Sequence, residues 1–216
     1  AERQHRTFTD SHGVVVHHYV WMPGRPKGVV QLAHGVGEHA LRYELLAQDL
    51  VAAGYAVYAD DHRGHGQTGV EYWKGDLTQI GRLGVGGLRA TQQDLLDLTE
   101  IAKAAHPDLP FVMLGHSWGS LMVQNLLNQG AHPWSAVVLT GTALRTPTDM
   151  NGGDLNARHK HLGDTGAEWL SRDPAVARAF VDDPLTTDAK ILKLFGLADG
   201  LRLFGRPKRV QPPVPL

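Results

Sequence analysis

Apolar positions change their spacing near residue 27. Before it, two segments that alternate apolar and polar residues, Arg6–Thr9 and Val14–Trp21, flank Ser11-His12-Gly13 and predict a β-hairpin. After it, short and nearly continuous apolar runs predict strands that are buried on both faces of a parallel sheet. These runs are Gly28–Ala33, Tyr55–Ala59, Phe111–Leu114 and Ala136–Leu139.

Segments with helical spacing separate these runs. They are Arg42–Ala53, Gly87–Ala105 and Trp118–Asn128. Alternating strands and helices predict an α/β fold with a mostly parallel, doubly wound sheet that begins with antiparallel strands.

The alternation stops after Thr140. Residues 146–209 contain Pro147, Pro174 and Pro184 between short helical stretches and show no buried strand, so we expect a helical cap inserted into the core. The predicted organisation is a core over residues 1–145, the cap over 146–209, and the start of a returning core strand over 210–216.

Composition excludes several classes of protein. The chain of 216 residues has 21 Lys and Arg against 22 Asp and Glu and no Cys, which gives no reason to expect nucleic acid and excludes thiolate chemistry. No apolar run is long enough to span a membrane. The first ten residues lack the apolar core of a signal peptide, and we expect a cytoplasmic location.

The clearest chemical motif follows the strand at Phe111–Leu114. Gly115-His116-Ser117-Trp118-Gly119 fits G-x-S-x-G between a predicted strand and a predicted helix. In that context the serine lies on a sharp turn, and its hydroxyl projects beyond the sheet edge as a nucleophile. The alternative is a glycine-rich turn with a capping serine.

A second loop, His34-Gly35-Val36-Gly37-Glu38-His39, follows Gly28–Ala33 and precedes a helix. Acyl transfer needs two N–H donors for the oxyanion, one from the residue after the nucleophile and one from this loop. We therefore expect the backbone N–H groups of Trp118 and Val36 to form the oxyanion hole.

The same loop also fits a dinucleotide-binding fingerprint. Gly35 to Ala40 reads G-x-G-x-x-A, and Asp60 follows at the typical distance. Two observations oppose this reading: Glu38 would place a carboxylate against the pyrophosphate, and the motif does not follow the first strand.

Two long segments carry a family resemblance. HGVGEHALRYELLAQDLVAAGYAVYADDHRGHGQT and HPDLPFVMLGHSWGS resemble the monoacylglycerol lipase and lysophospholipase branch of the α/β-hydrolase fold, over about residues 6–145. The resemblance implies hydrolysis of carboxylic esters of acyl chains, with an acyl ester or lipid as substrate and no metal or organic cofactor. An amidase, a peptidase or a binding module without catalysis remains an alternative on this fold.

The chain departs from this family at the sharp turn that carries Ser117, here called the elbow. Trp118 stands where the family usually has Met, and Ser120 where it usually has Gly. In the predicted cap, Leu194 and Phe195 belong to an apolar stretch that either packs on the core or acts as a lid that binds acyl chains and contacts lipid transiently.

Most of the 13 histidines need no catalytic role. We expect those in the two family-like segments to hold loops by hydrogen bonds, and we expect Asp61 and Arg63 to form a buried structural pair. Metal binding by His17-His18 or by His159 and His161 is not expected, because no carboxylate has matching spacing.

The triad partners of Ser117 are the remaining question. In this fold the acid and the histidine follow the nucleophile along the chain. Downstream of Ser117 only His132, His159 and His161 occur, and none follows a buried strand. We therefore expect the triad Asp and His to lie outside this chain, in a C-terminal continuation or a second polypeptide.

Overall fold

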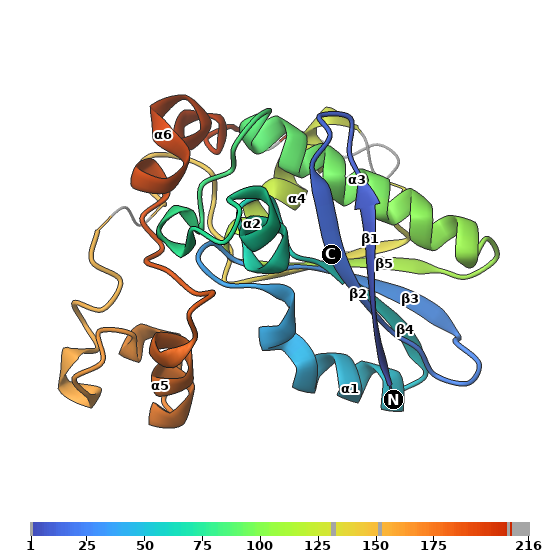
Figure 1. The fold of residues 1–216 in the computed structure, drawn as a ribbon, viewed down its shortest axis with the longest axis horizontal. Coiled ribbons are helices and arrows are strands. Elements are labelled where there is room, and N and C mark those ends of the chain that lie inside the picture. The colour runs from blue at the N-terminus through green and yellow to red at the C-terminus, as the bar shows by residue number, and fades with distance from the viewer. Residues whose placement is uncertain (1, 131–132, 151–152, 207, 209–216) are drawn as a thin grey trace.

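The computed structural model describes residues 2–130, 133–150, 153–206 and 208. A six-stranded sheet with the order β1-β2-β4-β3-β5-β6 forms its centre (Figure 1). β1 and β2 are antiparallel to each other, and β2 is antiparallel to β4, whereas β4, β3, β5 and β6 run parallel. The strands are β1 (Arg3–Thr9), β2 (Val15–Trp21), β3 (Gly28–Ala33), β4 (Tyr55–Asp60), β5 (Phe111–His116) and β6 (Ala136–Thr140). The predicted antiparallel start and parallel remainder are confirmed.

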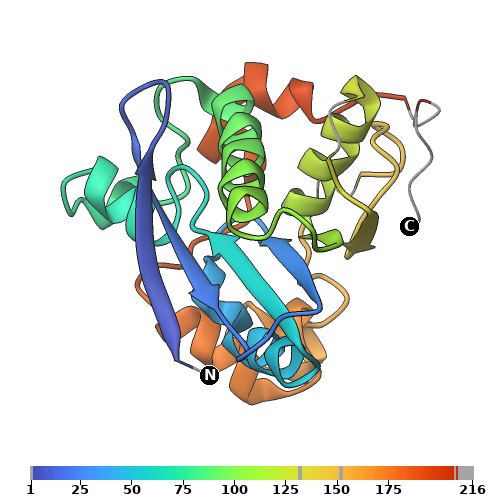
Figure 2. The same ribbon diagram turned by 90° about the vertical axis from the view of Figure 1, so that its right-hand side faces the viewer.

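Helices cover both faces of the sheet (Figure 2). On one face, α3 (Gly87–Ala105) and α4 (Trp118–Gln129) pack on the larger apolar core, which contains Leu95 and Met113. On the other face, α1 (Glu44–Ala52) packs on a smaller core that contains Leu32 and Val57. Every residue of β3 is buried as a result, which explains its continuous apolar run.

The predicted helices occur with small shifts at their ends. The first begins as a 3₁₀ turn, η1 (Ala40–Tyr43), before α1, while α3 has the predicted bounds. No helical pattern predicts α2 (Gly66–Tyr72) or the 3₁₀ turn η2 (Leu77–Gln79). Both glycines of α2 are required by close packing. A Cβ atom at Gly66 would lie 2.2 Å from Cγ of Asp61, and one at Gly69 would lie 2.4 Å from the Gly64 oxygen.

Residues 146–206, here called the cap segment, contain short helices and no strand in their described part. These elements are η3 (Lys160–Leu162), η4 (Glu168–Leu170), α5 (Pro174–Asp182) and α6 (Ile191–Arg202). Asp173 caps α5 through the Ala175 N–H, and Gly196, with φ of 77°, kinks α6. The predicted strand over 210–216 lies outside the described residues.

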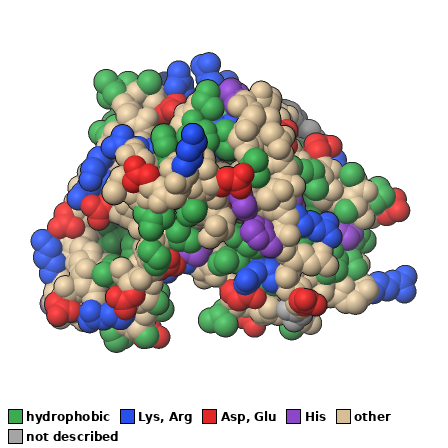
Figure 3. Space-filling view, in the orientation of Figure 1, with side chains coloured by type: hydrophobic (Ala, Val, Ile, Leu, Met, Phe, Trp, Pro, Cys, Tyr) green, Lys and Arg blue, Asp and Glu red, His purple; other side chains and the backbone are tan. Residues whose placement is uncertain are grey.

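Figure 3 shows one face of the molecule, on which basic and acidic side chains are interspersed. No large patch of one charge sign is visible on this face. Among the described residues, no helix is both long and apolar enough to cross a bilayer.

Candidate active site

Ser117 occupies the sharp turn between β5 and α4. Its φ of 50° and ψ of −121° place a residue that is not glycine in a left-handed conformation, which costs about 1–3 kcal/mol and is typical of functional turns. A hydrogen bond of 2.9 Å from the Ser117 N–H to the Thr140 oxygen of β6 supports the turn.

Both glycines of the motif are required by close approach. A Cβ atom at Gly119 would lie 2.2 Å from the Ala33 oxygen at the end of β3, and one at Gly115 would lie 2.9 Å from Cα of Ser120. The motif therefore allows α4 to begin directly against the sheet.

The loop after β3 lies beside this turn. A Cβ atom at Gly35 would be 3.1 Å from Cβ of Ser117. The Gly35 N–H donates to Oε1 of Glu38 at 2.7 Å, and the Gly37 N–H donates to Nε2 of His65 at 3.1 Å. Two of the three amides at positions 35–37 are therefore engaged within the protein.

The remaining loop amide belongs to Val36. Neither its N–H nor that of Trp118, the first residue of α4, has a hydrogen-bond partner in the part of the chain that the structure describes. Unpaired amides beside a serine hydroxyl, at the amino end of a helix, are suited to stabilising negative charge on an oxyanion.

Buried histidines support the loop. Nδ1 of His34 bonds the Gly35 oxygen at 2.7 Å, and Nε2 of His34 accepts the His62 N–H at 3.0 Å. Because His65 accepts the Gly37 N–H, three histidines link this loop to the one after β4. The prediction that these side chains hold loops is confirmed.

His34 and His65 are neutral at neutral pH. Burial lowers the pKa of His65 to about 3, and burial together with His62 keeps the pKa of His34 well below its usual value. Neutral rings suit their role, since Nε2 of His65 must remain an acceptor for Gly37.

No base contacts the hydroxyl of Ser117 within the described residues. The neighbouring His116 bonds the Thr140 hydroxyl at 2.9 Å, and His159 and His161 lie at η3 in the cap segment. His132 lies outside the described residues. The structure thus places the loop that carries Val36 beside Ser117 and Trp118, and among the described residues it places no catalytic histidine there.

Comparison with known proteins identifies the family. The family described as "Serine aminopeptidase, S33" (Hydrolase_4) matches residues 24–198. The chain belongs to this family of α/β hydrolases. It is 36% identical over 199 residues to a monoacylglycerol lipase from Mycolicibacterium smegmatis, across 88% of this chain and 67% of the relative. It is 28% identical to the monoglyceride lipase of Homo sapiens, across 82% of this chain and 58% of that lipase.

A carboxyl esterase from Bacillus coagulans has a similar structure, with a TM-score of 0.76, 26% identity, and coverage of 91% of this chain and 72% of the esterase. The α/β-hydrolase fold is therefore confirmed. The chain spans 67% and 58% of the length of the two lipases it matches.

Ser120 stands where the family usually has glycine, and its hydroxyl is hydrogen-bonded. Its hydroxyl donates to the Ser117 oxygen at 2.6 Å and lies 2.8 Å from the Thr142 hydroxyl. The substitution adds a polar bond at the start of α4, which the sequence pattern did not indicate.

Asp61 and Arg63 are both buried, but they do not pair with each other, so that prediction was wrong. The Asp61 carboxylate accepts the backbone N–H groups of Ala40 at 2.9 Å and Gln67 at 2.8 Å, and the Tyr19 hydroxyl at 3.1 Å. It therefore holds the starts of η1 and α2, where free N–H groups attract a carboxylate.

Arg63 reaches a different set of partners. Its guanidinium donates to Asp94 of α3 at 2.8 Å and to Asp10 in the β1–β2 turn. These partners are 31 and 53 residues away along the chain, so no local pattern could have revealed them.

Leu194 and Phe195 lie on α6, and both contact the core. The Phe195 ring centroid is 4.7 Å from that of Trp118, and a Cβ atom at Gly81 would be 3.0 Å from the Leu194 methyl groups. Contact of either residue with an acyl chain stays a prediction.

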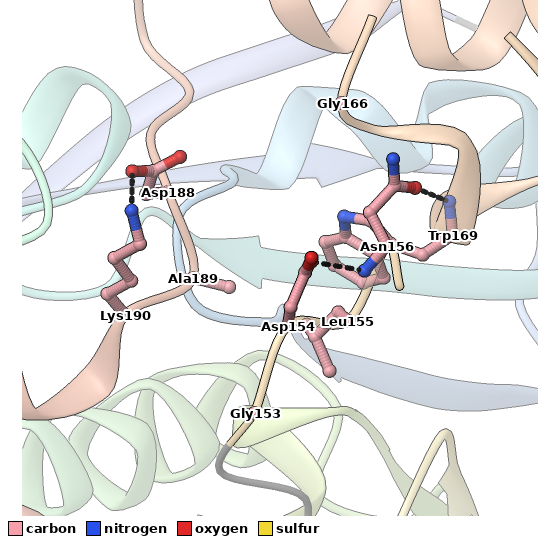
Figure 4. A pocket seen from close by; sticks show the side chains of 9 residues that line it. All are labelled: Gly153, Asp154, Leu155, Asn156, Gly166, Trp169, Asp188, Ala189 and Lys190. Atoms are coloured by element: carbon pink, nitrogen blue, oxygen red, sulfur yellow. Dashed lines mark hydrogen bonds and ion pairs between the residues drawn. The ribbon is translucent and has the colours of Figure 1, made fainter. Parts of the chain in front are cut away.

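A cavity of about 650 Å³ lies within the cap segment (Figure 4). Asp154, Trp169 and Lys190 are among its lining residues. Thr187, which precedes the lining residue Asp188, contacts the loop after β3: its N–H donates to the Gly37 oxygen at 2.9 Å. The charged side chains among the residues that line the cavity, Asp154, Asp188 and Lys190, distinguish it from an apolar acyl channel.

Among the described residues, no group of three or more His, Asp or Glu side chains could hold a metal ion. His17 lies between His5 and Glu71 on one face of β2, while His18 is buried on the other.

Proposed function

We propose that this protein is a serine hydrolase that cleaves carboxylic esters of acyl chains. The observation that carries the proposal is Ser117 in a left-handed conformation at a strand-to-helix turn, next to the loop after β3. The amides of Val36 in this loop and of Trp118 have no hydrogen-bond partner among the described residues. Holding this turn costs free energy, and presenting a nucleophile next to N–H donors is its clearest use.

The reaction follows from these groups. Oγ of Ser117 attacks the ester carbonyl carbon while a histidine removes its proton, and the tetrahedral oxyanion accepts hydrogen bonds from the N–H groups of Val36 and Trp118. Collapse expels the alcohol, which takes the proton from the histidine. Water then attacks the acyl-enzyme in the same way and releases the carboxylic acid and free Ser117.

We propose that the triad Asp and His lie outside residues 1–216. Support comes from the absence of any base at the Ser117 hydroxyl among the described residues and from the greater length of the lipases. The required segment is either continuous with this chain or a second polypeptide. Efficient turnover by residues 1–216 alone would contradict this and direct attention to His132, His159 and His161.

The names of the relatives favour a monoacylglycerol or a similar acyl ester as substrate. The family description leaves peptide hydrolysis as an alternative. Comparing p-nitrophenyl esters with aminoacyl p-nitroanilides distinguishes the two activities. A cytoplasmic location and transient contact of the cap segment with lipid are further proposals.

Replacing Ser117 by Ala in the complete natural polypeptide tests the central proposal. Hydrolysis of p-nitrophenyl esters should fall at least about 10³-fold, because no nucleophile remains. The melting temperature should hold or rise, since only the hydroxyl is removed. Ser11→Ala, at an exposed serine in the β1–β2 turn, is the matched control and should keep full activity.

A fluorophosphonate probe gives an independent measurement. It should label the wild-type polypeptide and not Ser117→Ala. Absence of labelling in a folded wild-type protein would indicate a binding module without a working triad, and unchanged labelling of the variant would place the nucleophile elsewhere.

A further inference from the structure

We propose that the indole of Trp118 is a positioning residue that couples α6 of the cap segment to both oxyanion donors. The inference rests on the proposed function, because it assigns a role to the side chain of a residue whose backbone N–H is one of those donors. Trp118 is also where this chain departs from the methionine usual in the family.

The indole lies between the core and the cap segment. It is 1% exposed, and its ring centroid is 4.7 Å from that of Phe195 on α6. On the core side its ring centroid is 5.2 Å from that of His65 and 5.4 Å from that of His62, with the His62 ring in an edge-to-face arrangement. These four rings are called the aromatic cluster.

The aromatic cluster reaches both donors. One donor is the backbone N–H of Trp118 itself. The other belongs to Val36, whose neighbour Gly37 donates to His65 at 3.1 Å. A shift of the indole would therefore disturb the start of α4 and the ring that holds the loop after β3.

Packing alone holds the indole in place. Its Nε1–H is buried and has no hydrogen-bond partner among the described residues. Removing the Phe195 ring would open space against the indole, and no hydrogen bond among the described residues would stop the indole from turning into that space. Phe195 is thus the contact through which the position of α6 affects the elbow.

A second contact connects the cap segment to the same loop. The Thr187 N–H donates to the Gly37 oxygen at 2.9 Å, so Gly37 bonds the cap segment through its oxygen and the core through its N–H. Asp199 of α6 accepts the Leu88 N–H at 3.1 Å and anchors the helix on α3. The loop after β3 is therefore hydrogen-bonded to both the cap segment and the core through one residue, Gly37.

This role differs from acyl-chain binding by Phe195 in a measurable way. A side chain that contacts the acyl group should affect long esters more than acetate esters and should raise KM. A side chain that acts through Trp118 should lower kcat equally for both and leave KM nearly unchanged, since the oxyanion is present only in the transition state.

The test compares Phe195→Ala with Phe195→Tyr, which keeps the ring, and with Leu197→Ala, which removes an exposed side chain from the same helix. The complete natural polypeptide is used throughout. Amide hydrogen exchange is measured at Gly37 and Thr187, with the amide of Leu98 in α3 as the reference for global stability.

We expect exchange at Gly37 and Thr187 to be about tenfold faster in Phe195→Ala, with Leu98 unchanged. The kcat for acetate and long-chain p-nitrophenyl esters should fall about tenfold for both, with KM within about twofold. Phe195→Tyr and Leu197→Ala should resemble the wild type. Trp118→Met should reproduce the effect of Phe195→Ala, which provides a second variant if the first does not fold.

Unchanged exchange at Gly37, or a loss of activity that grows with acyl length, would overturn the inference. If exchange responds as expected while no polypeptide hydrolyses any ester, the aromatic coupling stands and the proposed function fails.

Discussion

The parts of the molecule before and after residue 146 are stabilised in different ways. In the first part, helices pack on both faces of the sheet, and α3 alone buries Leu88, Leu95 and Leu98 completely. In the cap segment, the buried apolar side chains among the described residues are Ala167, Ala177 and Leu203. The core therefore has a close-packed apolar interior, which the cap segment lacks.

Polar contacts hold the cap segment instead. Asn156 and Glu168 are buried and bond each other at 2.6 Å, and Asn156 also accepts the Trp169 N–H at 3.0 Å. Leu192, Leu197 and Leu201 of α6 remain exposed. The nucleophile is therefore placed by rigid packing, whereas the cap segment is attached through a few specific contacts. It can therefore rearrange at a smaller cost in free energy.

The largest expected effect concerns the elbow. Gly119→Ala should destabilise the protein by about 4 kcal/mol and abolish activity, because the new Cβ would overlap the Ala33 oxygen and force α4 away from β3. Urea denaturation measures the loss. Gly24→Ala is the control: its Cβ meets no atom within 4 Å and its φ is ordinary, so stability should change by less than about 0.5 kcal/mol. Equal effects would show that the elbow is not closely packed.

Two leucines, one in the core and one in the cap segment, test this difference in packing. Leu98→Ala in α3 should cost about 3 kcal/mol, since the side chain is fully buried, whereas Leu197→Ala in α6, at 69% exposure, should cost less than about 0.5 kcal/mol. Both values come from urea denaturation of the complete polypeptide. A large loss for Leu197→Ala would mean that another surface covers α6.

The smallest effect is a dependence on pH. His18 is buried in β2 without a hydrogen-bond partner for either ring nitrogen among the described residues, and burial lowers its pKa to about 4. Between about 4 and the unfolded value near 6.5, only the unfolded state binds the proton, so the free energy of unfolding falls as the pH falls through this window.

His18→Phe removes the ring that binds this proton in the unfolded state. Between pH 7 and pH 4.5 the wild type should therefore lose about 2 kcal/mol more than the variant, as measured by urea denaturation at both values. The control is His161→Gln at an exposed position of η3, which should follow the wild type. Parallel losses in wild type and His18→Phe would contradict burial of a neutral ring.

The elements with the strongest patterns were predictable. The runs at Gly28–Ala33 and Phe111–Leu114 lie in β3 and β5, and α3 has the predicted bounds, because burial on both faces or along one stripe leaves a clear period. α2 escaped detection, since its glycines serve close packing and it has no apolar stripe. The Asp61–Arg63 pairing was wrong because sequence proximity says nothing about which distant amide or carboxylate a buried charge will meet.

The fold class and the motif around Ser117 could be predicted from the sequence, because the spacing of glycines, serine and apolar runs is local information. Which loop amides have partners among the described residues follows only from the tertiary structure, since it depends on Glu38 and His65 reaching Gly35 and Gly37. The tertiary structure also placed Phe195 on Trp118, 77 positions earlier in the chain. Contacts of this kind depend on how α6 packs against the core, and no periodicity along the chain records them.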